Sequence, residues 1–558
     1  MNDIRRTLLW VVFTMSLVML WDAWNRHNGQ PTLFGGPIAT ESASAVSGPL
    51  PNGVPAPVAA TGTSAQPATA PVAAANTAAP GEQVVIRTDV LKVTLDSRGG
   101  DMARVELLKY PEVEDPTKPV VLLDESPTHI YLAQTGYIGA HGAALPNHFT
   151  ALVAQPGERE LKDGANDLSV RFESPEVGGA KWVKTYTFHR GQYAVDVKNE
   201  LSNVGAAPLS PQLYLQLQRD GGEAGGAPPF TPTFTGPAVY TDVKKYQKVE
   251  FADIGKRKAG EAPGHETKAN DGWIGIVQHY FASAWIVSAP GERNFVTKKD
   301  KENLYSVAMI QPLGELAPGA TKTHNAQLFV GPQEERTLEA LAPGLELMKD
   351  YGWLAPLSKP LFWVLEQLHK YLNNWGWAIV GLVVLLKIAF YWLNANAYKS
   401  MAKMKAINPR LMEMRERLKD KPQEMNTEMM RIYREEKVNP LGGCLPIFVQ
   451  MPFFIALYWV LLSTVEMRGA PWIGWITDLS AKDPWFILPL LMTVSSLVQV
   501  ALGAKPPDPM QAKMMWIMPL AFSVMFFTFP SGLVLYWLTN NVLSIAQQWL
   551  INKRMGVA

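Results

Sequence analysis

The sequence predicts a multi-span α-helical membrane protein that carries a large exported domain of the all-β sandwich class. Two observations support this fold class. Residues 375–550 are dense in Leu, Val, Ile, Met, Phe and Trp, in apolar runs of membrane-spanning length. Roughly residues 80–350 have the composition of a polar globular chain, and Gly- and Pro-rich turns separate short alternating segments there.

Charge and cysteine content restrict the kinds of site. The chain has 51 Lys and Arg against 50 Asp and Glu in 558 residues, so its net charge indicates no class of partner. The single cysteine, Cys444, excludes an intrachain disulfide and a multi-cysteine metal site. No phosphate-binding loop of the form GxxxxGK followed by Ser or Thr occurs. We therefore expect no cofactor and no metal.

The first 24 residues are predicted to form a signal anchor. Arg5 and Arg6 precede the apolar run Thr7–Trp21, and no small-x-small cleavage site follows it. We expect this helix to stay uncleaved, with its N-terminus in the cytoplasm. Residues 25–82 are mostly Ala, Pro, Thr, Ser, Gly and Val, too few of them large to bury a core. They are predicted to be a disordered linker on the far side of the membrane.

Residues 83–350 are predicted to form the β-sandwich. Val90, Lys92 and Thr94 alternate with Leu91, Val93 and Leu95, as expected for a half-buried strand. Further strands are predicted at 182–189, 212–218, 271–287 and 326–330, without a long helical segment between them. The histidines of this domain are scattered without metal-ligand spacing, and we expect no catalytic site there.

Residues 351–373 are predicted to form an amphipathic helix at the outer membrane interface. Leu361, Leu365 and Leu368 lie on one side, and Glu366 and Lys370 lie on the other. The alternative is a helix that packs on the exported domain.

The first span of the C-terminal part, at about 375–396, contains one cation. Lys387 lies about nine residues, or roughly 13 Å, from the cytoplasmic end of this helix. A cation at that depth costs about 2.5–3.5 kcal/mol, so we expect Lys387 to face a polar or watery cavity. The alternative is a lysine that extends its side chain to the headgroups.

Residues 398–439 are predicted to form a cytoplasmic helical hairpin. Apolar residues such as Met404, Ile407 and Leu411 recur at spacings of three and four, and Pro422 marks the turn. The outer face is rich in cations, which indicates the cytoplasmic side. Its candidate docking residues for a ribosome or for anionic lipid are Lys403, Lys405, Arg410, Arg415, Arg417, Arg431 and Arg434. A merely solvated face is the alternative.

Four more spans are predicted at about 443–466, 485–502, 514–529 and 532–551. With the signal anchor and the Lys387 helix they make six spans, and both termini lie in the cytoplasm. The spans contain polar residues, among them Gln450, Gln499 and Asn540. Two interpretations are open. These residues either form hydrogen bonds between helices, or they line a hydrated groove together with Lys387.

Several sequence blocks resemble one known family. NANAYKSMAKMKAINPRLMEMRERLKD, EMMRIYREEKVNPLGGCLPIFVQMPFFIALYWVL and FPSGLVLYWLTNNVLSIAQQWL are similar to the YidC/Oxa/Alb membrane protein insertases. The resemblance covers about residues 374–550. The preceding anchor, linker and β domain resemble the Gram-negative type, whose exported domain is a β-supersandwich of the sugar-mutarotase type.

The resemblance implies a five-helix insertase core at 374–558 with a groove open to cytoplasm and lipid. Lys387 stands where the family usually has Arg, which keeps the charge but loses the bidentate fork. Trp537 stands where the family often has a second tyrosine. The residues that the resemblance implies as substrate contacts are Pro452, Phe453, Leu457, Val460, Leu461, Pro530, Leu533, Tyr536 and Trp537.

The resulting hypothesis is a membrane protein insertase and chaperone of the bacterial inner membrane. It is not an enzyme, and it inserts and helps fold its substrates alone or with the Sec translocon. Its expected partners are nascent membrane proteins, the ribosome, the Sec translocon and the lipid bilayer, with no DNA. The alternative is a small-solute or proton-coupled transporter. Against it, this sequence shows no second intramembrane charge and no visible inverted repeat. An enzyme that acts through the β domain is a third class.

Overall fold

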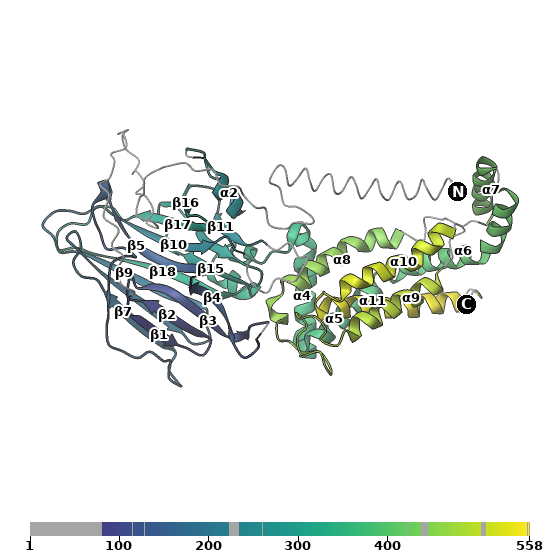
Figure 1. Ribbon diagram of the computed structural model, residues 1–558, viewed down its shortest axis with the longest axis horizontal. Coiled ribbons are helices and arrows are strands. Elements are labelled where there is room, and N and C mark those ends of the chain that lie inside the picture. Colours follow the sequence, from purple (N-terminus) through teal and green to yellow (C-terminus); the bar gives the residue numbers. More distant parts are fainter. Residues whose placement is uncertain are drawn as a thin grey trace.

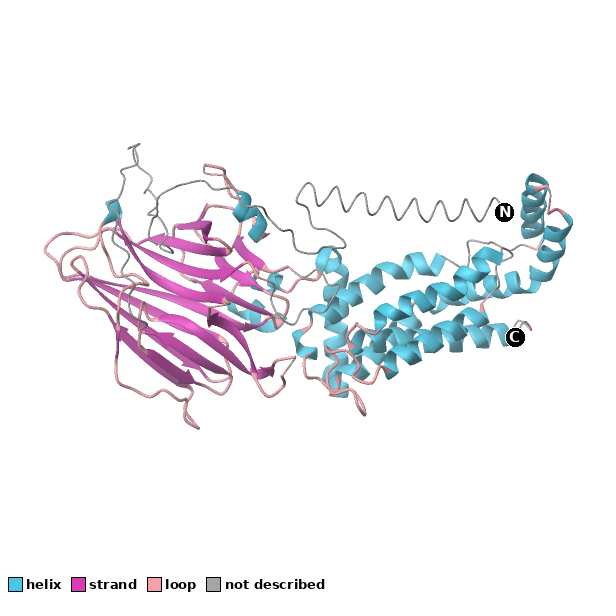
Figure 2. Ribbon diagram, viewed as in Figure 1, coloured by secondary structure: helices cyan, strands magenta, loops and turns pink. Residues whose placement is uncertain are grey.

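Figure 1 presents a computed structural model of the chain, which describes residues 81–113, 115–127, 129–222, 234–258, 260–419, 421–436, 445–503, 509–554 and 556. The predicted signal anchor and nearly all of the predicted linker lie outside these residues. The strands gather at one end of the molecule and the long helices at the other (Figure 2).

The first of two nine-stranded antiparallel sheets has the order β1-β2-β3-β4-β5-β10-β17-β16-β13. Its strands are β1 (Gln83–Arg87), β2 (Leu91–Asp96), β3 (Asp101–Pro111), β4 (Pro119–Glu125), β5 (Ile130–Gly139), β10 (Pro211–Asp220), β17 (Leu304–Pro312), β16 (Arg293–Lys301) and β13 (Lys268–Ala269).

The second sheet has the order β12-β11-β14-β15-β18-β9-β8-β7-β6. Its strands are β12 (Lys245–Lys248), β11 (Gly236–Thr241), β14 (Trp273–Val277), β15 (Phe281–Ile286), β18 (Thr321–Pro332), β9 (Ala194–Asn203), β8 (Ala180–His189), β7 (Asp167–Glu173) and β6 (Val153–Ala154). The large sandwich of two antiparallel sheets is confirmed, and so are the strands predicted at 182–189, 212–218 and 326–330.

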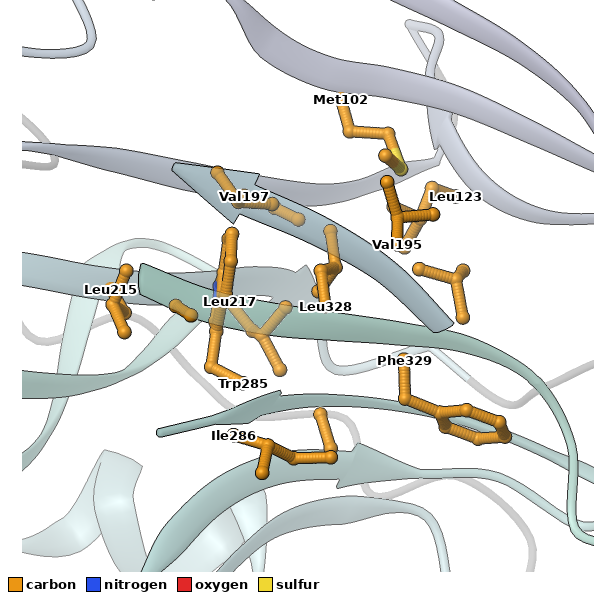
Figure 3. Packing of buried hydrophobic residues seen from close by; sticks show 14 of the residues in the cluster. Met102, Leu123, Val195, Val197, Leu215, Leu217, Trp285, Ile286, Leu328 and Phe329 are labelled. Atoms are coloured by element: carbon orange, nitrogen blue, oxygen red, sulfur yellow. The ribbon is translucent and has the colours of Figure 1, made fainter. Parts of the chain in front are cut away.

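The two sheets share one hydrophobic core. Leu215 and Leu217 of β10 lie close to Trp285 of β15 and Leu328 of β18, and all four are fully buried (Figure 3). The indole of Trp285 also donates to the carbonyl oxygen of Gln216 at 3.0 Å, which joins the two sheets through a satisfied polar group.

The single strand predicted over 271–287 is wrong. The chain forms a hairpin instead, with β14 and β15 joined at Gln278–Tyr280, where the Gln278 amide donates to the Phe281 carbonyl at 2.9 Å. This turn contains neither Gly nor Pro, and both strands are buried on both faces, so periodicity and turn signals were absent from the sequence.

The helices follow in chain order. They are α2 (Phe251–Lys256), α3 (Glu335–Leu341), α4 (Ala355–Leu372), α5 (Trp375–Ala389), α6 (Tyr391–Arg417), α7 (Pro422–Glu435), α8 (Leu445–Ser463), α9 (Ile487–Leu502), α10 (Pro509–Phe526) and α11 (Ser531–Arg554). Short 3-10 turns lie at Ala140–Gly142, Leu345–Met348, Gly352–Leu354 and Val465–Met467.

The helix predicted at 375–396 is not one helix. It breaks after α5, and α6 leaves at an angle of 70°. No helix breaker stands at the junction; the bend instead accompanies contacts with α8. The Phe390 ring lies 5.0 Å from that of Phe453, and the Gln450 amide donates to Asn394 Oδ1 at 3.0 Å.

Within the described residues, no single helix has both the length and the apolar character of a membrane span. The α5–α6 pair has them only when taken together, and shorter apolar helices occur at Val449–Ser463, Ile487–Leu502 and Ala512–Phe526.

Specific polar contacts attach the sandwich to the helical part. Lys349 Nζ lies 3.3 Å from Glu466 Oε2, in the turn after α8, and the Arg468 guanidinium donates to the Pro111 carbonyl at 2.7 Å. The Arg468 guanidinium also lies over the rings of Tyr280 and Phe281, at 5.4 and 5.2 Å. We call this contact region the seam.

Candidate functional site

A small cavity lies between the helices at the predicted groove cation. It has a volume of about 20 Å³, enough for about one water molecule. Three helices and one helix junction supply its walls. The lining residues are Val383, Leu386 and Lys387 of α5, Phe390 at the α5–α6 junction, Gln450, Phe453 and Phe454 of α8, and Tyr536 and Asn540 of α11.

The start of α5 fixes where Lys387 lies along the helix. Asn373 takes the left-handed conformation that ends α4, and Asn374 then caps α5 by accepting from the Trp377 amide at 3.0 Å. The Asn374 side-chain amide also donates to the carbonyls of Pro471 and Trp472, both at 3.1 Å. The cap thus joins α5 to the loop between α8 and α9, and Lys387 follows it by about 20 Å.

Lys387 is half-buried and has a neutral partner. Its ammonium donates to the Ser544 hydroxyl at 2.7 Å, and that hydroxyl donates to the Asn540 carbonyl at 2.7 Å. No carboxylate forms an ion pair with Lys387 among the described residues. Because an ammonium has three donors, this cation retains the capacity to bind an incoming anionic or polar group.

Other polar residues join neighbouring helices. Gln450 of α8 bonds Asn394 of α6, and the Asn541 amide of α11 donates to the hydroxyls of Ser495 and Ser496 in α9, at 3.1 and 2.9 Å. Such bonds hold helices together where water is scarce. Gln499 is half-buried on α9 and does not line the Lys387 cavity. The structure therefore brings Gln450 and Asn540 to Lys387, but not Gln499.

The aromatic residues of the predicted substrate path form a cluster beside the cavity. The Phe454 ring lies 5.6 Å from both Tyr536 and Trp537, and Trp537 lies 5.1 Å from Phe526. Phe453 and Tyr536 line the cavity itself. Pro452 is half-buried within α8.

The remaining residues of that path lie in the helical core. They are buried and pack against α4, α5 and the loop before α9, and they comprise Leu457, Val460, Leu461, Pro530 and Leu533.

The predicted cytoplasmic hairpin comprises α6 and α7. The apolar residues between these two helices are buried, as their spacing predicts. They are Ile407, Leu411, Met414, Ile432 and Tyr433.

The hairpin cations fall into two groups. Arg410 pairs with Glu435 and Glu436 at 3.0 and 2.7 Å, while Glu428 lies 2.6 Å from Arg431 and 3.9 Å from Arg417. In the described part of the hairpin, Lys403, Lys405 and Arg434 have no ion pair, and Arg415 is half-exposed. Within the described hairpin, Lys403, Lys405 and Arg434 therefore carry a positive charge that no carboxylate balances in an ion pair.

Sequence reasoning missed two residues of the site. Asn394 is the polar partner of Gln450, and Phe454 anchors the aromatic cluster. Ser544 belongs to the polar residues of the predicted spans that could line the groove, but its pairing with Lys387 was not predicted. Ser544 comes 157 residues after Lys387, and nothing in the sequence pairs them. Their spacing within α11 places Asn540 and Ser544 on one face of that helix, which is the only available signal.

The β domain contains a buried polar cluster whose hydrogen bonds hold parts of the sandwich together. Lys184 donates to the Gly99 carbonyl at 3.1 Å and lies 3.5 Å from Asp101, while the Tyr186 hydroxyl donates to Gly100 at 2.7 Å. Burial raises the pKa of Asp101 to about 7 and lowers the pKa of Lys184 to about 8. These bonds fasten the turn between β2 and β3 to β8. In the part of the chain that the structure describes, no group of three or more His, Cys, Asp or Glu side chains could hold a metal ion.

Two family models match the chain. The model of the YidC periplasmic domain matches residues 83–364, and the model of the 60Kd inner membrane protein matches residues 367–557. The chain is 55% identical to the membrane protein insertase YidC of Cupriavidus taiwanensis over 563 residues, which cover 99% of this chain and 98% of that protein. It is 52% identical to the protein of the same name from Ralstonia nicotianae over 557 residues, with the same coverage.

Solved structures give weaker matches. An active YidC insertase with its first transmembrane domain resolved aligns with a TM-score of 0.39 and 17% identity, over 83% of this chain and 91% of that one. A galactose mutarotase related enzyme from Lactobacillus acidophilus aligns with a TM-score of 0.31 and 9% identity, over 45% of this chain and 97% of that one. At these scores neither likeness carries an argument about the chain.

Proposed function

The chain belongs to the YidC family of membrane protein insertases and acts as a membrane protein insertase, and we propose that the cavity at Lys387 receives the polar part of its substrate. The observation that carries the proposal is the bonding of Lys387. A half-buried ammonium whose partner is a neutral hydroxyl attracts a carboxylate or another polar group more strongly than it holds Ser544. An acidic tail that enters from the cytoplasm crosses less hydrocarbon when it pauses there.

The cavity must widen for this step, because it holds about one water molecule. We propose that α6 and α8 part at their contacts near the α5–α6 bend, which are the Gln450–Asn394 bond and the Phe390–Phe453 ring contact. Both contacts are replaceable by a polar or aromatic substrate group. The walls that stay fixed are α5 and α11, which Lys387 and Ser544 join.

The apolar part of the substrate then moves along the aromatic cluster into lipid. Phe453, Phe454 and Tyr536 line the cavity, and the Trp537 ring contacts Phe454 at 5.6 Å, which extends the aromatic lining. Burial of apolar surface at about 25 cal/mol per Å² drives the segment from water into lipid, so the step needs no nucleotide. The buried Leu457, Val460, Leu461, Pro530 and Leu533 support this surface from behind.

We further propose the six-span topology with both termini in the cytoplasm, in which α5 and the start of α6, then α8, α9, α10 and α11 follow the N-terminal anchor. The apolar helices support it by composition, and the cation-rich hairpin supports the cytoplasmic side. Lys403, Lys405 and Arg434 are then placed to meet a ribosome. The lateral faces of the helices lie outside the seam, and we propose that they contact the Sec translocon. The transporter alternative has no support from the two relatives described above, both of which are named insertases.

Photo-cross-linking of a stalled nascent chain tests the proposal. A photoreactive residue replaces Phe453, Trp537 or, as a control, Val524, which is 70% exposed on α10. We expect a ribosome-bound two-span substrate to cross-link at Phe453 and Trp537 and not at Val524. Equal cross-linking at all three positions would show that the substrate contacts the helical part without using the cavity.

A further inference from the structure

A large pocket lies at the edge of the β-sandwich, between α2 and β16, whose labels adjoin in Figure 1. Its volume is about 680 Å³, within the range of about 300–1,000 Å³ usual for ligand sites. One wall is α2 with the loop that follows it, and the other is the strand segment from Asn294 to Lys299. The pocket belongs to the periplasmic-domain match and is separate from the Lys387 cavity.

Arg257 is the most firmly positioned cation of this pocket. One guanidinium nitrogen donates to the Thr297 hydroxyl at 3.0 Å, and the other donates to the Thr297 carbonyl. His265 holds the same hydroxyl at 2.9 Å. Among the described residues no carboxylate pairs with Arg257. Thr297 therefore orients a half-buried guanidinium without neutralising it, and its remaining N–H donors are preorganised for an oxyanion.

Further cations surround Arg257. Lys258, Lys268 and Lys299 also line the pocket and form no ion pair within the part of the chain described here. Lys298 lies 3.0 Å from Asp300, and Glu261 is the carboxylate among the lining residues. A concave surface with several like charges focuses the electrostatic potential and concentrates counter-ions.

We infer that this pocket binds a small, multiply charged anion with phosphate or carboxylate groups. The oxyanion binds Arg257 through the N–H donors that Thr297 does not engage, and Lys258, Lys268 and Lys299 balance the remaining negative charge. The same chemistry is found in soluble organic anions and in the headgroups of anionic phospholipids.

Isothermal titration of the full chain in a neutral detergent tests the inference. The probes are citrate and glycerol 1-phosphate, which both have oxyanion and hydroxyl groups, with uncharged glycerol as the reference. We expect saturable binding of both anions and none of glycerol. Arg257→Gln should weaken binding about tenfold or more, since a hydrogen bond to a charged group contributes about 1.5–3 kcal/mol.

Two surface variants keep the test independent of folding. Lys299→Gln removes an exposed pocket cation and should weaken binding severalfold, whereas Lys244→Gln removes an exposed lysine near β12, outside the pocket, and should not. Absence of saturable binding, or equal weakening by Lys244→Gln and Lys299→Gln, would overturn the inference.

The source of the anion is distinguished in nanodiscs. If phosphatidylglycerol nanodiscs abolish citrate binding that phosphatidylcholine nanodiscs allow, the headgroup of an anionic lipid occupies the pocket. If citrate binds equally in both, the ligand is a soluble anion. Insertion by the Lys299→Gln variant is measured in parallel, and failure of the anion site with normal insertion leaves the proposed function intact.

Discussion

At the scale of single residues, the ammonium of Lys387 is bound by one hydroxyl. The Ser544 hydroxyl accepts a hydrogen bond from the ammonium and donates one to the Asn540 carbonyl, so the cation is bound to α11 through a short polar chain. The position of a cation in the helical part could be predicted from the sequence, because one lysine interrupts a long apolar run. Its partner could not, because a serine in an apolar helix has the same local pattern whether or not it meets a charge.

Replacement of Ser544 tests this bond. Ser544→Ala removes the acceptor of Lys387, and we expect insertion of a small two-span substrate to slow about tenfold or more, since a hydrogen bond to a charged group contributes about 1.5–3 kcal/mol. Ser523→Ala is the matched control, because the Ser523 hydroxyl donates to the Pro519 carbonyl within its own helix. A double-mutant cycle with Lys387→Met measures the coupling. Additive effects of the two changes would contradict a functional bond.

Two histidines of the β domain give opposite pH dependences. Burial lowers the pKa of His148 to about 3, from an ordinary value near 6.5. The folded domain keeps His148 neutral while the unfolded chain binds a proton below about pH 6.5. We therefore expect the urea concentration at which the sandwich unfolds to be lower at pH 5 than at pH 7. Limited proteolysis of the full chain monitors this unfolding. The slope attributable to this residue is about 1 kcal/mol per pH unit, and His148→Gln should remove it.

His189 supplies the contrast of sign. Its ring bonds Asp196 at 2.9 Å and Asp167 at 2.6 Å, and these hydrogen bonds, Asp196 first, raise its pKa. Its contribution is complete below the unfolded pKa and is lost as the pH rises through the higher folded pKa. His189→Gln should therefore lower stability at pH 5 and leave it unchanged at pH 9. A stability loss that is equal at both pH values would refute the linkage.

At the scale of elements, the seam between sandwich and helices combines one buried and one exposed ion pair. The side chain of Lys349 is fully buried beside Glu466, and its ammonium lies 3.9 Å from the centre of the Phe362 ring. Arg336 and Glu366 pair at 2.6 Å with the arginine 61% exposed. Sequence patterns showed an amphipathic helix at 351–373 and left open whether it packs on the exported domain. The structure shows that its Leu361, Phe362 and Leu365 are buried against the other helices.

The two pairs should differ in what they contribute. Glu466→Gln leaves the Lys349 ammonium buried without its carboxylate, and we expect a loss on the order of 2 kcal/mol in the stability of the seam. Arg336→Gln disrupts an exposed pair and should cost below about 1 kcal/mol. Hydrogen exchange of residues 345–354 in the full chain measures both. Equal protection in the two variants would mean that the buried pair does not hold the seam.

The break between α5 and α6 shows why one predicted element failed. Periodicity and composition continue through Phe390, so a single helix at 375–396 was the natural expectation. The 70° bend depends on the contacts of Phe390 and Asn394 with α8, which come from residues more than fifty positions away. The apolar contact between α6 and α7 was predicted correctly, because the spacing of its residues can be read from the local sequence.

At the scale of the whole molecule, the division into an exported sandwich and an apolar helical part followed from composition alone. The order of the strands did not, because β5 pairs with β10 and β9 with β18 across long stretches of sequence. The polar site could be predicted from the sequence in part. Lys387, Gln450, Phe453, Tyr536 and Asn540 meet at one cavity, whereas Gln499 lies outside it and the buried residues of the predicted path lie behind it.

In the proposed mechanism the charge of Lys387 serves insertion, and complementation tests this role most directly. Cells depleted of their own insertase receive this chain as wild type, Lys387→Arg, Lys387→Ala or Lys387→Glu, with Lys370→Glu on the half-exposed face of α4 as the charge-reversal control. Growth and insertion of a two-span substrate with an acidic tail are measured. We predict rescue by the wild type, Lys387→Arg and Lys370→Glu, partial rescue by Lys387→Ala, and failure of Lys387→Glu. Full rescue by Lys387→Glu would contradict a role of the positive charge, since an anion cannot attract the acidic tail.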